Sequence, residues 1–71
     1  MANWYVNHRI EWIAETLRVF GYINRQHLTT KFGISMPQAS GDLKLFLRLY
    51  PDSMRYDPQQ KRYLSKKWRV Q

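Results

Sequence analysis

The chain has 71 residues and no cysteine. This length allows one small domain and excludes a barrel or a two-lobed active site, while the absence of cysteine excludes disulfides and thiol catalysis. No apolar run approaches the roughly 18 residues of a membrane span, and the first residues lack a signal-peptide pattern. We therefore expect a single domain over residues 1–71 that works in the cytoplasm without a membrane.

The charge balance favours a polyanionic partner. Twelve Lys and Arg oppose five Asp and Glu, which gives a formal net charge of +7. The charge is concentrated in the second half: residues 1–20 are balanced, whereas residues 55–71 carry six basic side chains against one acidic one. Such asymmetry is typical of nucleic-acid-binding domains. The alternative is a basic surface that only aids solubility.

A first helix is predicted at residues 5–20. Gly21 follows it, and glycine at this position ends helices because it readily adopts a positive φ. Tyr22 and Ile23 are too few to form an independent strand, but they could pair with a hairpin elsewhere in the chain. The apolar stripe that predicts the helix comprises Ile10, Ile13, Ala14, Leu17 and Phe20.

A second helix of two turns is predicted at residues 25–32. Asn24 is a favourable N-cap, because its side-chain oxygen can accept a hydrogen bond from a backbone N–H of the first turn. Ile23 and Leu28 flank this cap at the positions of a hydrophobic staple. Gly33 ends the segment.

The third helix, predicted at residues 36–49, begins with a capping box formed by Ser35 and Gln38. Pro37 is tolerated in the first turn, because its missing N–H would have no intrahelical partner there. Pro51 disfavours helical geometry at the residue before it. The apolar stripe of this helix comprises Ala39, Leu43, Phe46 and Leu47.

The residues after the third helix predict a β-hairpin, with strands at residues 54–57 and 61–65. Asp57 followed by Pro58 suits a type I turn between the strands. We expect two tyrosines to face the core and two arginines to face solvent or a ligand: Tyr56 and Tyr63, and Arg55 and Arg62.

The two helices joined at Gly33 define a helix-turn-helix. A steep turn needs a glycine and an apolar residue that pins the corner, and Gly33-Ile34 meets both demands. Ala39 is small enough for the third helix to pass close to the second. With the hairpin, we predict a mainly α winged helix-turn-helix fold of three helices plus a small antiparallel hairpin. In this fold the third helix enters the major groove of duplex DNA, and the wing lies along the backbone or the minor groove.

Several short motifs are shared with a known family of regulators. They are Phe32-Gly33-Ile34-Ser35, Gln38-Ala39-Ser40, Asp42-Leu43, Tyr56-Asp57, Lys61 and Tyr63. The region from about Arg9 to Tyr63 resembles the N-terminal winged-helix domain of DeoR-type bacterial transcription regulators. It is most similar to the subgroup that carries a WYL ligand-sensing domain, which includes repressors of phage-defence operons. The resemblance implies sequence-specific binding to double-stranded DNA in transcriptional control, with repression as the expected outcome.

Two features depart from the family pattern. DeoR-type domains usually carry two arginines before the Asp-Leu pair, where this chain has Ser40 and Gly41, so the base contacts must differ. The chain also stops where a linker and a sensor domain would begin. We therefore expect an isolated DNA-binding domain or a small stand-alone regulator, such as a protein of a phage or a mobile element.

Three groups of residues are predicted to contact DNA. The exposed face of the third helix would read bases and consists of Ser35, Met36, Pro37, Gln38, Ser40, Gly41 and Lys44. The N-terminal end of the second helix would bind a phosphate through Asn24, Arg25 and Gln26. The wing would contact the DNA backbone through Arg55, Gln59, Gln60, Lys61 and Arg62.

Each of these assignments has a structural alternative. Gln38 could serve only as the capping-box partner, and Asn24 only as an N-cap. Gly41 could reflect close packing rather than a close approach to DNA, and the hairpin could simply be solvated. Asp42, an acidic residue on a helix that faces DNA, is interpreted as structural and paired with a nearby arginine.

A second apolar face on the first helix predicts a homodimer. Tyr5, Trp12 and Val19 recur every seven residues, and in a monomer they would expose aromatic surface. Alternatively, Trp12 and the N-terminal residues could fold over the small core. For Tyr50 and Trp68 we expect core or edge packing.

We predict that the chain is not an enzyme and that it binds neither a metal nor a cofactor. His8 and His27 are the two histidines of the chain; neither has a metal-ligand partner at suitable spacing, and no catalytic triad or glycine-rich phosphate loop can be assembled. Two other functions remain open. One is a protein-interaction module that uses the aromatic face of the first helix, and the other is an RNA-binding winged helix that uses the basic hairpin.

Overall fold

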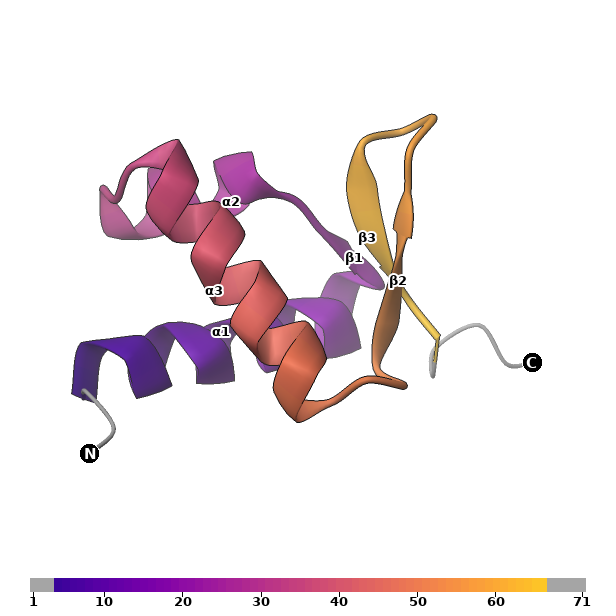
Figure 1. Ribbon diagram of the computed structural model, residues 1–71, viewed down its shortest axis with the longest axis horizontal. Coiled ribbons are helices and arrows are strands. Elements are labelled where there is room, and N and C mark those ends of the chain that lie inside the picture. Colours follow the sequence, from indigo (N-terminus) through magenta and orange to yellow (C-terminus); the bar gives the residue numbers. More distant parts are fainter. Residues whose placement is uncertain (1–3, 67–71) are drawn as a thin grey trace.

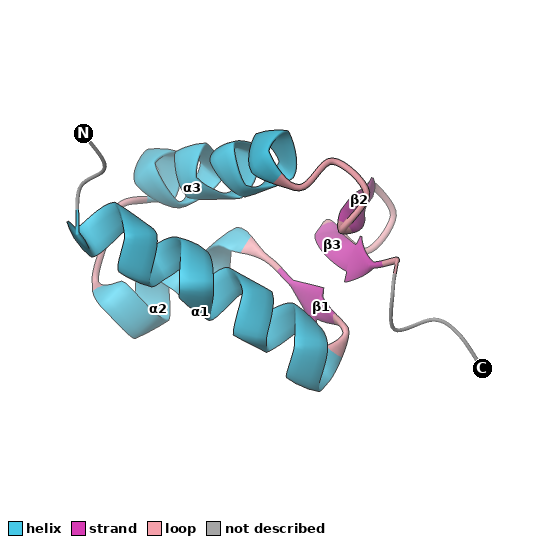
Figure 2. Cartoon of the chain, turned by 90° about the horizontal axis from the view of Figure 1, so that it is seen from below, coloured by secondary structure: helices cyan, strands magenta, loops and turns pink. Residues whose placement is uncertain are grey.

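The computed structural model describes residues 4–66. Figure 1 shows helices at one end of the domain and strands at the other, and Figure 2 shows α3 in a separate layer from α1. The predicted mainly α fold with a small antiparallel sheet is confirmed. Its elements are α1 (Trp4–Phe20), β1 (Tyr22–Ile23), α2 (Arg25–Phe32), α3 (Met36–Leu49), β2 (Met54–Asp57) and β3 (Arg62–Ser65).

The sheet is antiparallel, with the strand order β1-β3-β2. β2 and β3 form the hairpin, with Tyr56 opposite Tyr63. β1 adds to the other edge of β3, with Tyr22 opposite Leu64 and Ile23 opposite Tyr63, so these two residues do pair with the hairpin, which the sequence had left as a possibility. Because β1 connects α1 to α2, this pairing fixes the position of the wing relative to the helices.

Two glycines end helices in the left-handed conformation that side chains disfavour. Gly21 (φ 83°) follows α1, and Gly33 (φ 66°) follows α2. The Gly33 N–H donates to the carbonyl of Thr29 at 2.8 Å. The chain can therefore change direction within three residues before α3 begins at Met36.

Capping boxes begin both α2 and α3. The Ser35 hydroxyl accepts from the N–H of Gln38 at 3.2 Å, and the Gln38 side chain accepts from the N–H of Ser35 at 3.4 Å, which confirms the predicted box. The Asn24 side chain accepts from the N–H of His27 at 3.0 Å. His27 Nδ1 accepts in return from the N–H of Asn24 at 3.1 Å. This last bond was missed, because the motif normally uses Glu or Gln.

The core lies where the three helices meet the sheet. Leu17 and Phe46 are buried in it. The ring of Tyr50 packs against Phe46 at the edge of the core, which agrees with the edge packing expected for Tyr50. Trp68 lies outside the described residues. The largest fully buried side chains come from five different elements and are Ile13, Ile23, Leu28, Leu43 and Met54.

The helical stripes were only partly correct. Ala14 is exposed, Phe20 is 69% exposed and Leu47 is half-buried. The buried positions of α1 are Ile10, Ile13, Thr16 and Leu17. Ala14 lies outside this stripe and Phe20 is the last residue of the helix, so neither reaches the core.

The start of the second hairpin strand also needs correction. The sequence predicts Lys61 as its first residue, but β3 begins at Arg62. Lys61 has a φ of 56°, and its N–H donates to the carbonyl of Asp57 at 2.7 Å. This bond closes the loop one residue later than expected and places Lys61 in the turn.

A bidentate ion pair joins α1 to α3. Arg9 Nε lies 2.5 Å from Asp42 Oδ2, and Arg9 Nη2 lies 3.2 Å from Asp42 Oδ1. Both side chains are largely buried, which supports the structural interpretation of Asp42 and identifies its partner. Because a buried carboxylate is costly without a partner, the pair restricts the rotation of α3 about its own axis.

Asp42→Ala is expected to lower the free energy of unfolding by about 3 kcal/mol, because it leaves the Arg9 guanidinium buried without a partner. Glu15→Ala is the control, since it breaks the exposed Arg18–Glu15 pair and such pairs contribute only about 0–1 kcal/mol. Urea denaturation followed by circular dichroism measures both values. Equal losses in the two variants would contradict the structural role of Asp42.

Candidate nucleic-acid interface

The N-terminal half of α3 has one buried and one exposed face. Ala39, Asp42 and Leu43 are buried in the domain. The residues predicted to read bases remain accessible: Ser40 is half-buried, and the exposed ones are Ser35, Met36, Pro37, Gln38, Gly41 and Lys44.

Gly41 lies open on the outside of α3. A Cβ atom at this position would have no neighbour within 4 Å among the described residues. Close packing against those residues therefore does not explain this glycine. The missing side chain leaves a flat surface beside Gln38, whose Oε1 takes part in the capping box while its Nε2 can donate to another group.

A crevice of about 280 Å³ opens where the start of α2, the exposed side of α3 and the hairpin meet. We call it the α2–α3–wing crevice. It combines three cations from three segments of the chain, and none of its described lining residues is acidic. Such an arrangement favours a phosphate group. The lining residues are Asn24, Arg25, Ser40, Leu43, Lys44, Tyr56, Lys61 and Tyr63.

The crevice brings together residues from all three predicted groups. Arg25 Nη1 lies 3.5 Å from Ser40 Oγ, a contact that connects α2 to α3. Lys61 reaches the crevice from the hairpin turn, and Lys44 from α3. Five of the residues predicted to contact DNA therefore surround one opening: Asn24, Arg25, Ser40, Lys44 and Lys61.

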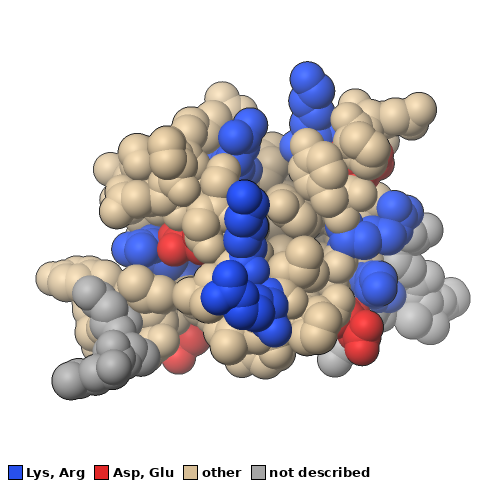
Figure 3. Space-filling model, viewed as in Figure 1, with Lys and Arg blue, Asp and Glu red and all other residues tan. Residues whose placement is uncertain are grey.

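Lys and Arg side chains gather on the face that carries α3 and the hairpin. Figure 3 shows them as a column down the middle of this face and as a second group on the hairpin side, with acidic side chains near the edges. The exposed turns of α3 therefore lie in a positively charged surface, which is the condition for steering a polyanion toward it.

The wing arginines lie apart from the crevice. Side chains alternate along a strand, so Arg55 and Arg62 lie on the opposite sheet face from Tyr56 and Tyr63. Arg55 is exposed, as expected. Arg62 is half-buried, with its guanidinium carbon 4.2 Å from the ring centre of Tyr22. The expectation that Arg62 is left for solvent or a ligand was therefore wrong, because β1 places an aromatic ring against it.

The two hairpin tyrosines also differ from each other. Tyr63 packs against the core, whereas Tyr56 is 48% exposed, because β2 is an outer strand of the sheet and β3 is its central strand. Their rings contact each other at a centroid distance of 5.0 Å. The inward packing predicted for Tyr56 was therefore wrong. Assigning both tyrosines to packing also missed that they line the crevice, although the alternation of the strands did place them on one face.

The remaining predicted residues are spread more widely. Gln59 and Gln60 are exposed at the tip of the hairpin, where their N–H groups donate to Asp57 Oδ1 at 3.0 and 3.4 Å. Asp57 therefore shapes the turn. Gln26 lines a separate cavity between α1 and α2, so it is not brought together with Asn24.

Burial raises the pKa of Tyr63, the neighbouring Tyr56 raises it further, and Arg25 lowers it. The Tyr63 hydroxyl is therefore protonated at neutral pH and can donate a hydrogen bond to an anion in the crevice.

The three helices, the left-handed turn at Gly33 and the three-stranded sheet define a winged helix-turn-helix domain. Residues 6–68 match the BrxR transcriptional regulator winged helix-turn-helix domain, and the chain belongs to this family.

Three relatives carry the name DNA-binding transcriptional repressor CapW. The protein from Escherichia coli (strain KTE188) is 47% identical over 66 residues, which cover 93% of this chain and 22% of that protein. The protein from Stenotrophomonas maltophilia is 44% identical over 90% of this chain and 21% of its own length. The protein from Pseudomonas aeruginosa is 42% identical over 87% of this chain and 21% of its own length. The chain thus spans about a fifth of the length of these relatives.

Two features are absent from residues 4–66. Within them, no helix is long and apolar enough to cross a membrane. The same residues contain no group of three or more His, Cys, Asp or Glu side chains placed to hold a metal ion.

Tyr56→Phe is expected to lower the pKa of Tyr63, because it removes the electrostatic influence of Tyr56. NMR titration of ¹³C-labelled tyrosine rings measures this value, and Tyr5→Phe on α1 is the control. The raised pKa of Tyr63 also means that its contribution to stability is complete below the ordinary tyrosine pKa of about 10 and is lost as the pH rises through the folded value. An unchanged Tyr63 titration in Tyr56→Phe would show that the two rings are not coupled.

Proposed function

We propose that this chain binds double-stranded DNA sequence-specifically, as the DNA-binding domain of a transcriptional repressor from a bacterium, a phage or a mobile element. The observation that carries the proposal is the exposed N-terminal half of α3 beside a crevice that holds Arg25, Lys44 and Lys61. Membership of a family of transcriptional regulator domains and the repressor name of the relatives support it.

In the proposed complex, α3 lies in the major groove, which is wide enough to admit a helix. Gln38 would make paired hydrogen bonds to adenine, and Met36 would contact a thymine methyl group. The absence of a side chain at Gly41 would let the helix approach the bases closely. Ser35 and Pro37 would complete the contact surface at the first turn.

The α2–α3–wing crevice would hold a backbone phosphate. Arg25, Lys44 and Lys61 would supply the positive charge, while Asn24 would supply a polar group at its edge. Contacts of this kind fix the register of the protein on the duplex without reading sequence. Beyond the crevice, the wing and the start of α2 would contact neighbouring parts of the backbone through Gln26, Arg55, Gln59 and Gln60.

We also propose that two copies associate through α1. Tyr5 is 67% exposed and Val19 is 59% exposed. Trp12 is half-buried and contacts Phe32 edge-on at 5.5 Å, so α2 covers part of the predicted face and the dimer contact would rest on Tyr5 and Val19. A homodimer would present two α3 helices to two half-sites of an operator.

Replacing both Tyr5 and Val19 with Ser is expected to raise the dimer Kd at least about a hundredfold, because each buried apolar side chain contributes roughly 1.5–3 kcal/mol. Sedimentation equilibrium measures the Kd. Asn7→Ser, a change at another exposed position of α1, is the control. A chain that stays monomeric at every concentration would contradict the dimer.

The larger protein context is a further part of the proposal. The relatives are several times longer than this chain, which leaves room for the WYL sensor domain expected from the DeoR-type resemblance. Residues 1–71 would form a single non-enzymatic DNA-binding unit in such a protein, working in the cytoplasm.

Lys44→Ala and Lys61→Ala are each expected to weaken binding to all duplexes alike and to reduce the slope of log affinity against log salt by about 0.9, because each removes one phosphate contact. Arg18→Ala removes the same charge from an exposed position of α1 and controls for net charge. Fluorescence anisotropy with a labelled random duplex at several salt concentrations gives the slopes. Equal slopes in the three variants would rule out the crevice as a phosphate site.

The double substitution Gln38→Ala and Ser40→Ala is expected to relax sequence preference while leaving the fold unchanged, because it removes polar groups from the reading face of α3. Selection from a random duplex library measures the preference, and circular dichroism checks the fold. An unaltered preference would favour the protein-interaction alternative. Preferential competition by structured RNA would favour the RNA-binding alternative.

A further inference from the structure

A second cavity, of about 520 Å³, lies between α1, β1 and α2. We call it the α1–α2 cavity. None of its described lining residues belongs to α3 or to the hairpin, and cavities of this size accommodate small organic molecules. The lining residues are Trp12, Thr16, Phe20, Tyr22, Gln26, His27, Thr30 and Lys31.

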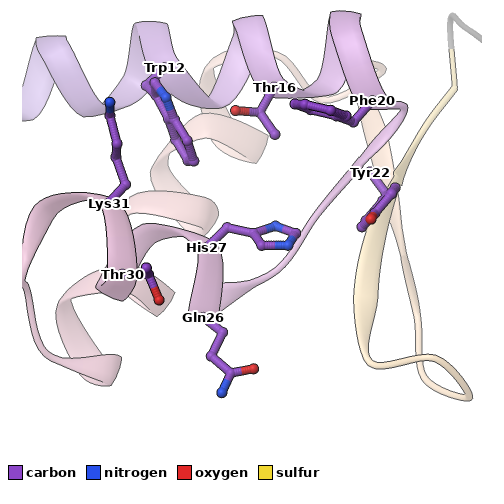
Figure 4. A pocket seen from close by; sticks show the side chains of 8 residues that line it. All are labelled: Trp12, Thr16, Phe20, Tyr22, Gln26, His27, Thr30 and Lys31. Carbon is purple, nitrogen blue, oxygen red and sulfur yellow. The ribbon is translucent and has the colours of Figure 1, made fainter.

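Aromatic rings form the walls of this cavity. Figure 4 shows Trp12, Phe20, Tyr22 and His27 around one space, projecting from α1, β1 and α2. Phe20 is largely exposed although it is apolar, and the rings of Tyr22 and His27 lie 5.6 Å apart. Flat apolar walls of this kind favour the ring of an aromatic ligand.

The polar groups of the cavity complement an anion. No described lining residue is acidic, whereas Lys31 extends toward α1 beside Trp12 and supplies an ammonium group at that end of the cavity (Figure 4). Because His27 Nδ1 accepts the N–H of Asn24, the neutral ring carries its proton on Nε2, which can donate to a ligand. Thr16 and Thr30 add hydroxyl groups.

We propose that the α1–α2 cavity binds a planar aromatic carboxylate. The ring of the ligand lies among Trp12, Phe20 and Tyr22, and its carboxylate lies near Lys31. A wholly apolar ligand would leave the Lys31 end of the cavity without a partner, and an aliphatic acid would leave the aromatic walls uncovered.

Two of these residues connect the cavity to the proposed DNA interface. His27 bonds to Asn24, which lines the α2–α3–wing crevice, and Tyr22 contacts Arg62 of the wing. We therefore expect ligand binding to be coupled to DNA binding, and this part rests on the proposed function. By linkage, a saturating duplex must change the ligand Kd by the same factor by which the ligand changes the DNA Kd.

The test is an NMR titration of the ¹⁵N-labelled chain with 1-naphthoate, with 1-naphthamide and cyclohexanecarboxylate as matched probes. Saturable shifts are expected at the amides of Thr16, His27 and Lys31, with 1-naphthoate binding at least about threefold more tightly than either comparison compound. Shifts scattered over the surface, or equal binding of the neutral amide, would overturn the proposal.

Two pairs of variants make the test specific. Lys31→Gln is expected to weaken 1-naphthoate binding at least about threefold, and Lys66→Gln, at another exposed lysine, to leave it unchanged. Thr30→Trp fills the cavity from its rim and is expected to abolish binding, whereas Asn7→Trp is not. Equal effects within either pair would overturn the site.

Two additional readouts separate the remaining outcomes. Shifts at the same amides on concentrating the chain without ligand would show that a second copy occupies the cavity, which overturns the proposal. An unchanged 1-naphthoate Kd in saturating duplex would overturn the coupling and leave the binding site standing. If no duplex binds at all, the proposed DNA function fails independently of the ligand titration.

Discussion

The orientation of α3 depends on where Asp42 can be buried. A carboxylate in the interior needs a partner of opposite charge, and Arg9 of α1 meets it with two hydrogen bonds. The neighbours of Asp42 on the inner face, Ala39 and Leu43, are then also directed into the core. The same rotation leaves Gln38 and Gly41 on the outside. The ion pair and the buried apolar residues Ala39, Leu43 and Phe46 thus act together in setting which residues of α3 are accessible.

The wing is held by a second set of contacts that involve the short strand β1. Ile23 is fully buried, while the adjacent Tyr22 contacts Arg62 on one side and His27 on the other. His27 in turn completes the cap of α2 with Asn24. The start of α2 and the hairpin are therefore connected through two aromatic side chains. This connection keeps Arg25 and Lys61 on opposite sides of one crevice.

Local signals predicted the helices and caps well, because caps and left-handed turns are decided by neighbouring residues. Asn24, Ser35 and Gly33 illustrate this, since each acts within about four residues of its own position. Contacts between distant segments could not be derived in the same way. The sequence suggested an arginine partner for Asp42 but did not identify it as Arg9. The pairing of β1 with β3, which places Tyr22 against Arg62, was only one of several possible pairings.

The contacts proposed between the predicted residues and DNA rest on the chemistry and exposure of those residues, and mapping a duplex onto the folded chain tests them most directly. In a ¹H–¹⁵N NMR titration with a random-sequence duplex at low salt, the account predicts amide shifts at residues 35–44 and at residues 59–61, with little change along residues 5–19. Shifts concentrated on residues 5–19, with α3 and the hairpin unaffected, would contradict the account.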